Sequence, residues 1–283
     1  MTLEWCCPMN MPATPSLAPS GHLTRRSFGA LLLATSAAAC APQVPESAPV
    51  AVAPDWLPEY APLRDAGYDL PAIPLQFTQG INRRMEGIYT GEAPPGSIDV
   101  DPYAKFLYHV KLDGTATRYP VGVGRQGRTL SGLATIQDKR AWPGWTPTAN
   151  MLRTEPEVYG GFRNGVPGGL RSPLGARALY IHRNGRDTYY RVHGTNDLPS
   201  IGNSGSAGCI RLFNQDIIHL FNNVDLPMTI NIRSEVESLR VDPENYNRGV
   251  ELPPTIISAD ELLNSEAVAS DRAPDLSQLA SNF

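Results

Sequence analysis

The sequence predicts a mainly β fold, either a β-sandwich or a barrel-like sheet, with one short helix. Proline and glycine together supply 52 of the 283 residues (27 Pro and 25 Gly), which favours loops and short strands over long helices. Between residues 96 and 233, short segments of alternating polar and apolar residues follow one another, separated by turn residues. Apart from one segment near the end of this region, no helical period lies between these strands, as it would in an α/β protein.

The first forty residues are expected to be a signal segment. Residues 24–28 (TRRSF) precede an apolar run at 29–39 that is too short to cross a bilayer and ends in small residues. An arginine pair before a buried helix is the alternative, but the alanines at 37–39 form a cleavage-site pattern. Residues 1–40 are therefore predicted to be a twin-arginine signal peptide, which implies a periplasmic or cell-envelope protein.

The cysteines agree with export. Of the four in the chain, Cys6 and Cys7 lie upstream of the signal, so only Cys40 and Cys209 remain afterwards. If Cys40 is lipidated after cleavage, it anchors the protein to a membrane surface; otherwise residues 37–39 form an ordinary A-x-A site. In either case no disulfide framework exists, and the thiol of Cys209 needs a chemical explanation.

Four segments follow from composition and charge. Signal residues 1–40 precede a proline-rich linker and N-terminal extension at 41–95, which begins APQVPESAPV. Residues 96–233 form the strand-rich domain, with 16 Lys/Arg against 10 Asp/Glu. Residues 234–283 form an acidic tail, with 3 against 10, predicted to be partly disordered. A basic domain suits an anionic partner such as a carboxylate-bearing peptide, and no aromatic-basic module for nucleic acid is present.

Seven strands are expected, in this order: SIDVDP (97–102), KFLYHVKL (105–112), ATRYPVGVG (116–124), GLATIQDK (132–139), RALYIHR (177–183), DTYYRVHG (187–194) and PMTINIR (227–233). Asp-Gly at 113–114 and Asn-Gly at 184–185 are hairpin turn signals. The one helix is expected at 214–223 (NQDIIHLFNN), with Asn214 as N-cap and its apolar residues on one side.

Three glycine-rich or tryptophan-containing stretches need separate interpretation. Residues 122–127 (GVGRQG) satisfy G-x-G-x-x-G, but a strand-like segment follows in place of a helix, so dinucleotide binding is rejected. Residues 159–179 are expected to approach closely either a peptide ligand or another strand. Trp142 and Trp145 are expected either to pack a loop or to form a substrate wall.

The chemistry concentrates in residues 191–212. His193 is expected near the end of a strand, and Cys209 follows sixteen residues later, after a connection rich in turn formers. A strand, a folded-back loop and a second extended segment would bring the imidazole within hydrogen-bond reach of the sulfur and keep it largely as thiolate. Either residue alone is most simply a packed core residue. Together they predict a thiol nucleophile with an imidazole base.

HGTN followed by GSAGCIRL resembles the active-site signature of the L,D-transpeptidase catalytic family (YkuD-type), bacterial cell-wall enzymes in which a peptidoglycan stem peptide acylates a cysteine. The matching positions are His193, Gly194, Ser206, Gly208, Cys209, Ile210 and Arg211. Ala207 departs from the commonest form, which has a second histidine there. The resemblance covers roughly half the chain and implies the mainly β L,D-transpeptidase fold, with the short helix after the cysteine.

The resemblance also implies roles for these residues. Cys209 would be the nucleophile, His193 the general base and acid, and the backbone carbonyl of Gly194 would orient the imidazole. Backbone N–H groups of Gly208 and Cys209 would stabilise an oxyanion.

The remaining site residues would bind substrate or hold the loop. Arg211 would bind a substrate carboxylate or brace the loop. Ser206 and Asn203 would hold the loop. No cofactor is expected, and no metal is expected because the other histidines and carboxylates show no ligand spacing.

The implied reaction is attack on the amide between the third residue of a tetrapeptide stem and the terminal D-Ala. The acyl group would then pass to an amine of a neighbouring stem or of an envelope protein; water as acceptor would make the protein an L,D-carboxypeptidase. A non-catalytic peptidoglycan-binding envelope protein is the alternative outside enzymes, and Ala207 favours it.

Two other families of cysteine enzymes fit the sequence less well. Sortase-like enzymes place the arginine on a later strand, and papain-like peptidases place cysteine before histidine.

Overall fold

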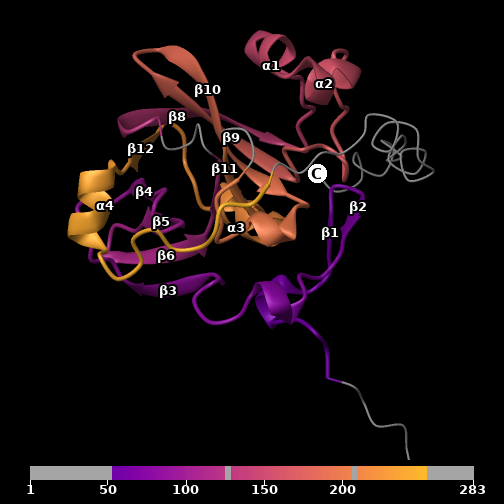
Figure 1. The fold of residues 1–283 in the computed structure, drawn as a ribbon. Helices are drawn as coiled ribbons and strands as arrows, with labels where there is room; N and C mark the ends of the chain where they lie inside the picture. The colour runs from indigo at the N-terminus through magenta and orange to yellow at the C-terminus, as the bar shows by residue number, and fades with distance from the viewer. Residues whose placement is uncertain (1–52, 125–128, 206–208, 254–283) are drawn as a thin grey trace, which may run out of the picture. The chain divides into compact units, whose positions relative to one another are not determined.

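The computed structural model describes residues 53–124, 129–205 and 209–253. Ten strands form one mixed sheet (Figure 1). In sheet order they are β3 (Met85–Ile88), β6 (Thr115–Pro120), β5 (Phe106–Val110), β4 (Ser97–Asp101), β12 (Met228–Ile232), β8 (Gly132–Ala141), β9 (Arg177–Arg183), β10 (Arg186–Thr195), β11 (Ile210–Phe213) and β7 (Gly122–Val123). The pairs β4–β12 and β10–β11 are parallel and the others antiparallel.

The sheet curls so that its two ends approach each other. Strand β6 lies next to one edge and β7 forms the other, yet only Val121 separates them in the chain. Strands from both sides of the sheet also bury side chains in a single hydrophobic cluster, which includes Leu107 of β5 and Leu179 of β9. The mainly β, barrel-like prediction is therefore confirmed, and each of the seven expected strand segments contains a strand.

The hairpin turns follow the sequence signals. Asn184 and Gly185 have φ of +52° and +75° between β9 and β10, as a two-residue turn with two positive φ angles requires. Gly114, between β5 and β6, has φ of +84°. These turns set the register of the antiparallel pairs on either side.

Helix α3 (Asn214–Asn222) is the expected helix after the cysteine, and it packs on β9, β10 and β11. Its N-cap is Phe213, so the prediction of Asn214 as N-cap is wrong. The Asn214 side chain instead accepts a hydrogen bond from Ala176 N at 2.9 Å and donates one to Thr195 O at 3.3 Å. Long-range backbone partners have displaced the local capping bond.

The prediction of a single helix is incomplete. Helices α1 (Ala149–Thr154), α2 (Pro156–Tyr159) and α4 (Glu235–Val241) are also present, with short 3₁₀ turns at Pro58–Tyr60, Leu75–Phe77, Gly160–Phe162 and Leu198–Ser200. Helix α4 begins with a capping box in which Ser234 and Glu237 satisfy each other's backbone N–H. None of the described helices is long and apolar enough to cross a bilayer.

Segments on both sides of residues 96–233 join the same folded unit. The N-terminal part contributes the hairpin β1 (Leu63–Asp65) and β2 (Tyr68–Leu70), and β3 pairs with β6. Beyond residue 233, the Ser238 hydroxyl of α4 donates to the buried carboxylate of Asp101 at 2.7 Å. Residues 254–283 of the predicted tail, and all of the predicted signal segment, lie outside the described residues.

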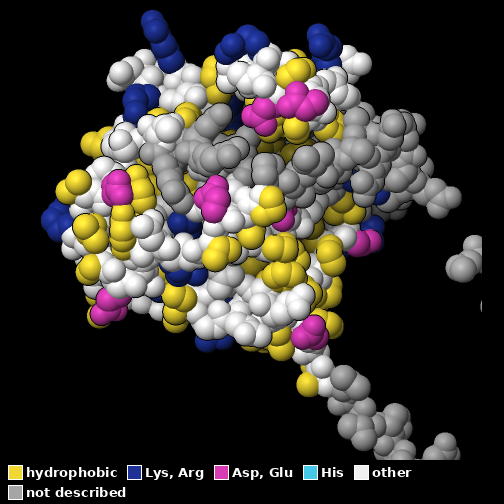
Figure 2. Space-filling model, in the orientation of Figure 1, with side chains coloured by type: hydrophobic (Ala, Val, Ile, Leu, Met, Phe, Trp, Pro, Cys, Tyr) yellow, Lys and Arg dark blue, Asp and Glu magenta, His cyan; other side chains and the backbone are white. Residues whose placement is uncertain are grey.

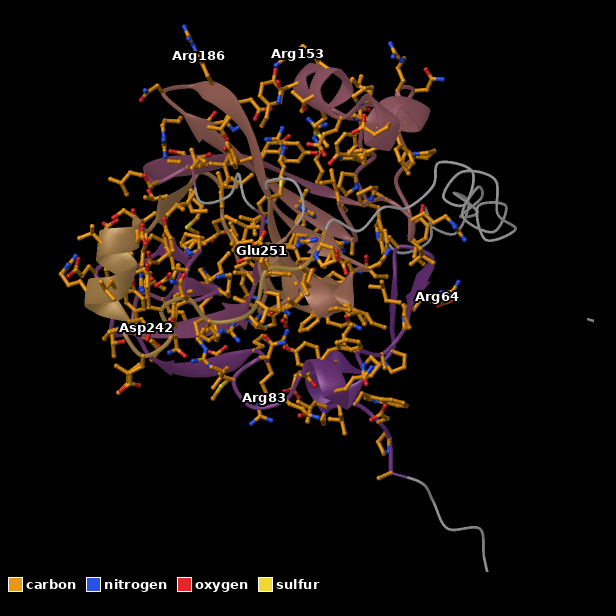
Figure 3. All side chains as sticks on the ribbon, in the orientation of Figure 1. Arg64, Arg83, Arg153, Arg186, Asp242 and Glu251 are labelled. Atoms are coloured by element: carbon orange, nitrogen blue, oxygen red, sulfur yellow. The ribbon has the colours of Figure 1, made fainter. Side chains whose placement is uncertain are left out.

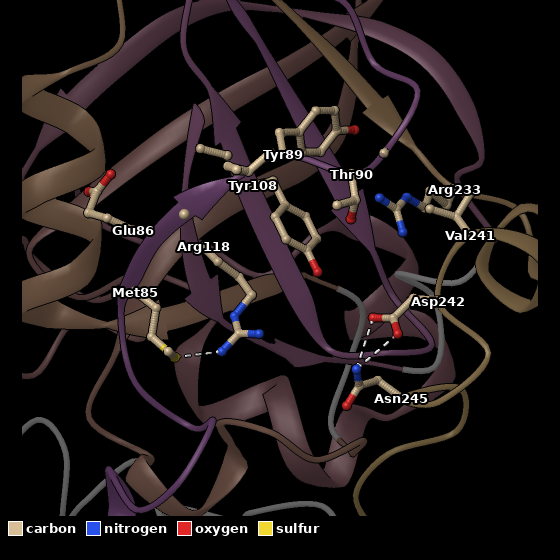
Figure 4. A pocket seen from close by; sticks show the side chains of 14 residues that line it. Met85, Glu86, Tyr89, Thr90, Tyr108, Arg118, Arg233, Val241, Asp242 and Asn245 are labelled. Carbon is tan, nitrogen blue, oxygen red and sulfur yellow. Dashed lines mark hydrogen bonds between the residues drawn. The ribbon is translucent and has the colours of Figure 1, made fainter. Parts of the chain in front are cut away.

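A cavity of 330 Å³ lies between β3, β5, β6 and the chain after α4 (Figure 4). Its side chains include Tyr89, Tyr108, Arg118, Asp242 and Asn245. None of its lining residues belongs to the predicted catalytic set.

Candidate active site

Strand register gathers the predicted residues on one face of β10 and β11. Val192 lies opposite Ile210, and His193 lies opposite Arg211. Side chains alternate between faces along a strand, and directly opposite residues share a face. Val192 and Ile210 are buried in the core, so His193 and Arg211 point to the other face. Cys209 stands one residue before Ile210, and its thiol accepts a hydrogen bond from the backbone of Arg191, so the same alternation directs it to the face of His193.

The His193 imidazole is held by its own backbone neighbour. His193 is 5% exposed, and its Nδ1 lies 2.6 Å from the carbonyl oxygen of Gly194. Because a carbonyl only accepts, Nδ1 carries the proton and Nε2 keeps a lone pair. Burial lowers the pKa of His193 to about 4; the charges of Arg211 and Arg191 act in the same direction, and the Gly194 carbonyl opposes them. The ring is therefore neutral at pH 7.

Cys209 carries a free thiol, and the residue is partly exposed. Its carbonyl accepts a hydrogen bond from Gly124 N at 3.3 Å, which ties it to the end of β7. Burial of the thiol raises its pKa, while a backbone hydrogen bond from Arg191 and the charges of Arg191 and Arg211 act in the opposite direction. The resting pair is thus a neutral thiol beside a neutral imidazole, whereas the sequence led us to expect a thiolate.

Arg211 braces the loop between the two strands. It is 7% exposed, and its guanidinium donates to Asp197 Oδ2 at 3.1 Å and to Gly205 O at 2.8 Å. Its Nε has no hydrogen-bond partner in the described part of the chain. Of the two roles that the resemblance implied, these contacts correspond to bracing.

Asn203 lies within the same loop. Its Nδ2 donates to Pro199 O at 2.8 Å, and its Oδ1 accepts from Val250 N at 2.9 Å. The other predicted loop residues, Ser206 and Gly208, lie with Ala207 outside the described residues. The structure therefore places His193 beside Arg211 and puts Cys209 directly before β11, with Asn203 in the loop that joins the two strands. The oxyanion N–H of Gly208 stays a prediction.

Close backbone contacts explain the glycines around the histidine. A Cβ on Gly175, where φ is +61°, would lie 2.5 Å from the carbonyl carbon of Gly194. A Cβ on Gly194 would lie 2.2 Å from Asn214 Oδ1. Of the two expectations for residues 159–179, approach to another strand therefore holds at Gly175. This contact packs the turn before β9 directly against the carbonyl that bonds His193.

The sequence analysis missed Arg191 as a member of the site. Arg191 binds the Asp187 carboxylate with both terminal nitrogens, each at 2.7 Å, and its charge acts on both His193 and Cys209. The signal was present, since Arg191 is two residues before His193 in a strand and so shares its face.

The two tryptophans pack loops, which agrees with the simpler of their two interpretations. Trp142 donates to Asp65 Oδ2 at 2.7 Å, and its ring centroid lies 4.2 Å from that of Tyr68. Trp145 contacts Phe162 edge to face, with centroids 5.9 Å apart. In the rejected nucleotide motif, Gly122 begins β7 and pairs with Arg211, and residues 125–127 lie outside the described residues.

The described side chains on the face shown in Figure 2 form no extended basic stripe. Figure 2 shows lysine and arginine side chains interspersed with acidic and hydrophobic ones over this face. Within residues 53–124, 129–205 and 209–253, no three histidine, cysteine or acidic side chains are grouped to hold a metal ion.

Comparison with known proteins agrees with this geometry. The YkuD family model, described as the L,D-transpeptidase catalytic domain, matches residues 95–233. The chain is 44% identical to YkuD of Bacillus subtilis (strain 168) over 150 aligned residues. These residues make up 53% of this chain and 73% of that protein. The chain therefore belongs to the L,D-transpeptidase catalytic domain (YkuD) family, a family of enzymes.

One further relative and one solved structure are similar to about half of this chain. ErfK/SrfK of Escherichia coli (strain K12), named a probable L,D-transpeptidase, is 33% identical over 145 residues, which are 50% of this chain and 45% of that protein. The chain thus spans less than half the length of this relative. A crystal structure from Brucella melitensis, titled a probable carnitine operon oxidoreductase, is 43% identical over 53% of this chain and 94% of its own, with a TM-score of 0.39.

Proposed function

We propose that the protein is an exported L,D-transpeptidase that acts on the tetrapeptide stems of peptidoglycan through a thioester on Cys209. Family membership supports the reaction class. The observation that carries the proposal is the parallel register of β10 and β11, which gives Cys209 and His193 one face and neighbouring positions on it. A nucleophile and its base need such proximity before chemistry begins.

In the first step the Cys209 sulfur attacks the carbonyl carbon of the amide that precedes the terminal D-Ala. Because both groups rest neutral, the thiol proton moves to Nε2 of His193 as the carbon–sulfur bond forms. The C–N bond then breaks, and the imidazolium returns the proton to the leaving D-Ala amine. The Gly194 carbonyl, bonded to Nδ1, keeps Nε2 directed toward the reaction throughout.

In the second step an amine resolves the thioester. The amine nitrogen attacks the thioester carbon while Nε2 of His193 accepts its proton, and that proton returns to the departing sulfur. An amine from a neighbouring stem gives a cross-link, an amine from an envelope protein gives an anchored protein, and water gives an L,D-carboxypeptidase. Backbone N–H groups at Gly208 and Cys209 are proposed to hold the oxyanion in both steps.

Export places the enzyme with its substrate. The TRRSF signal at 24–28 and the following apolar run support transfer to the periplasm or cell envelope. Cys40 is proposed as the point of membrane attachment if it is lipidated.

The test is release of D-Ala from a synthetic tetrapeptide stem with an amine acceptor present. Cys209→Ala removes the sulfur and is expected to abolish release, whereas Cys40→Ala, a matched loss of a thiol outside the site, is expected to retain it. Release by wild-type protein without amine would identify the carboxypeptidase. Binding of peptidoglycan without release by wild-type protein, under any acceptor, would favour the non-catalytic alternative.

A further inference from the structure

The chain beyond α4 returns to the catalytic loop. From Asp242 it runs across the molecule to Glu251, near the centre of the view in Figure 3. Leu252 N donates to Ser204 O at 2.7 Å, and Ser204 N donates to Val250 O at 2.9 Å. These reciprocal bonds form a parallel bridge between Ser204 and Glu251. We call residues 248–252 the strap.

The strap covers an edge that β7 leaves open. Ser204 forms a second parallel bridge with Val123 of β7, and Val123 N donates to Asn203 O at 3.2 Å. Residues 203–205 therefore lie as an extra extended segment between β7 and the strap. With the strap in place Ser204 is only 4% exposed, and the strap supplies hydrogen-bond partners to both its backbone N–H and its C=O.

The contact is built for backbone-to-backbone approach. Gly249 has φ of +84°, and a Cβ there would lie 2.0 Å from Gly202 O. Gly205 has φ of +140°, and a Cβ there would lie 2.7 Å from Leu252 O. Both sides of the contact thus need glycine. Asn203, a residue predicted for the site, accepts the N–H of Val250 at 2.9 Å.

Arg248 ties the other end of the strap to the sheet. Its Nε donates to Ala104 O and its Nη2 to Lys105 O, each at 2.9 Å. Its guanidinium also lies 4.3 Å from the ring centroid of Phe106, at the start of β5. The strap is therefore held at one end by the β4–β5 connection and at the other by the catalytic loop.

A short path joins the strap to the reacting groups. Leu252 bonds Ser204, the next residue Gly205 accepts from Arg211 at 2.8 Å, and Arg211 lies opposite His193 in the sheet. We infer that the strap is a positioning element of the active site, which holds the loop entering Cys209 so that the thiol stays in register with the imidazole. The role of the strap in catalysis rests on the proposed function. The strap also lies beyond residue 233, where the family match ends.

The test uses the full chain with Gly249→Ala against Gly114→Ala. Gly114 has the same φ of +84°, but a Cβ there meets nothing within 4 Å, so it matches the backbone strain without the contact. Three quantities are measured: the rate at which iodoacetamide alkylates Cys209, followed by peptide mass mapping, and the kcat and KM of D-Ala release. Gly249→Ala is expected to change the alkylation rate several-fold and to lower kcat about tenfold to a hundredfold with little change in KM. Gly114→Ala is expected to leave these quantities near the wild-type values.

A second pair removes a single hydrogen bond. Leu252→Pro deletes the N–H that bonds Ser204, whereas Leu252→Ala keeps it, so only the proline variant is expected to behave like Gly249→Ala. This pair decides the inference if Gly249→Ala does not fold. Wild-type alkylation and kcat in a folded Gly249→Ala or Leu252→Pro protein would overturn it. If wild-type protein releases no D-Ala, the proposed function fails, and the alkylation rates alone still decide whether the strap positions Cys209.

Discussion

The His193 ring meets the Gly194 carbonyl at 2.6 Å and lies in a buried site flanked by two arginines. These surroundings favour the neutral ring, because a buried imidazolium would lose its hydration close to other positive charges. The same burial keeps the Cys209 thiol protonated. Proton transfer and attack on the substrate are therefore expected to be coupled, in contrast to enzymes that hold a preformed thiolate.

This state makes stability depend on pH through His193. Its pKa of about 4 in the folded protein lies below the ordinary value of 6.5, so the unfolded chain binds an extra proton between these values. The free energy of unfolding is expected to fall as pH drops from 6.5 toward 4, by up to about 3 kcal/mol. His193→Gln should remove that part of the acid sensitivity.

Urea unfolding of the wild-type protein and of His193→Gln, at pH 7 and at pH 4.5, checks this prediction. His182→Gln serves as the control, since it removes an imidazole from β9 outside the site. An equal acid-induced loss of stability in wild-type protein and His193→Gln would show that the buried ring does not carry the effect.

Local sequence signals were enough to predict where His193 and Cys209 lie relative to the strands, but not the contacts that support them. His193 and Cys209 were predictable because strand alternation and turn formers act over a few residues, and Arg191 could have been found by the same alternation. The role of Asn214 was not predictable, because its partners Ala176 and Thr195 come from other segments and replace the local cap that the sequence favoured.

At the scale of elements, the N-terminal segment is tied to helix α3 by a buried carboxylate. Asp216 is fully buried, accepts from the Tyr60 hydroxyl at 3.0 Å and pairs with Arg84 at 3.2 Å. Ile73 and Tyr60 also pack against Phe213, the residue before α3. Residues predicted as linker therefore support the helix that follows the catalytic loop.

Asp216→Ala is expected to lower the free energy of unfolding by about 3 to 5 kcal/mol, because it leaves the Arg84 charge and the Tyr60 hydroxyl without their acceptor. Asp138→Ala is the matched control. Its pair with Arg140 is exposed, and its loss should cost about 1 kcal/mol or less. Urea denaturation of the two variants measures both values, and equal losses would contradict the account.

The strands, helix α4 and the strap differ in how well they could be predicted from the sequence. Strands and hairpin turns were predictable because alternation and Asn-Gly signals are local. Helix α4 could have been predicted from Ser234 and Glu237, whose S-x-x-E spacing is a capping box. The strap was not predictable, since the alternation at residues 250–252 is too short to indicate a strand and the segment pairs only with the distant loop at 203–205.

For the whole molecule, the order of strands in the curled sheet brings distant segments close together. Strand order places β7 beside β11 although β7 follows β6 directly, so residues near 123, 193, 204, 209 and 251 meet at one end of the sheet. Sequence patterns indicate a barrel-like fold but carry no information on this order, because it depends on packing between distant strands.

Export is the prediction that belongs to the whole chain. Replacing Arg25 and Arg26 with lysine is expected to reduce transfer by the twin-arginine route strongly and leave the protein in the cytoplasm. Fractionation of cells that express the wild-type and variant chains, followed by immunoblotting, measures this. Unchanged amounts of both in the envelope fraction would contradict the proposed signal.

The proposed function depends most on a covalent intermediate at one sulfur. The direct measurement is the intact mass of the protein after rapid mixing with a tetrapeptide stem and acid quench, with the modified residue located by fragmentation. The account predicts a mass increase equal to the tripeptide acyl group, located on Cys209 and missing from Cys209→Ala. Release of D-Ala by wild-type protein with no adduct, or an adduct on another residue, would contradict it.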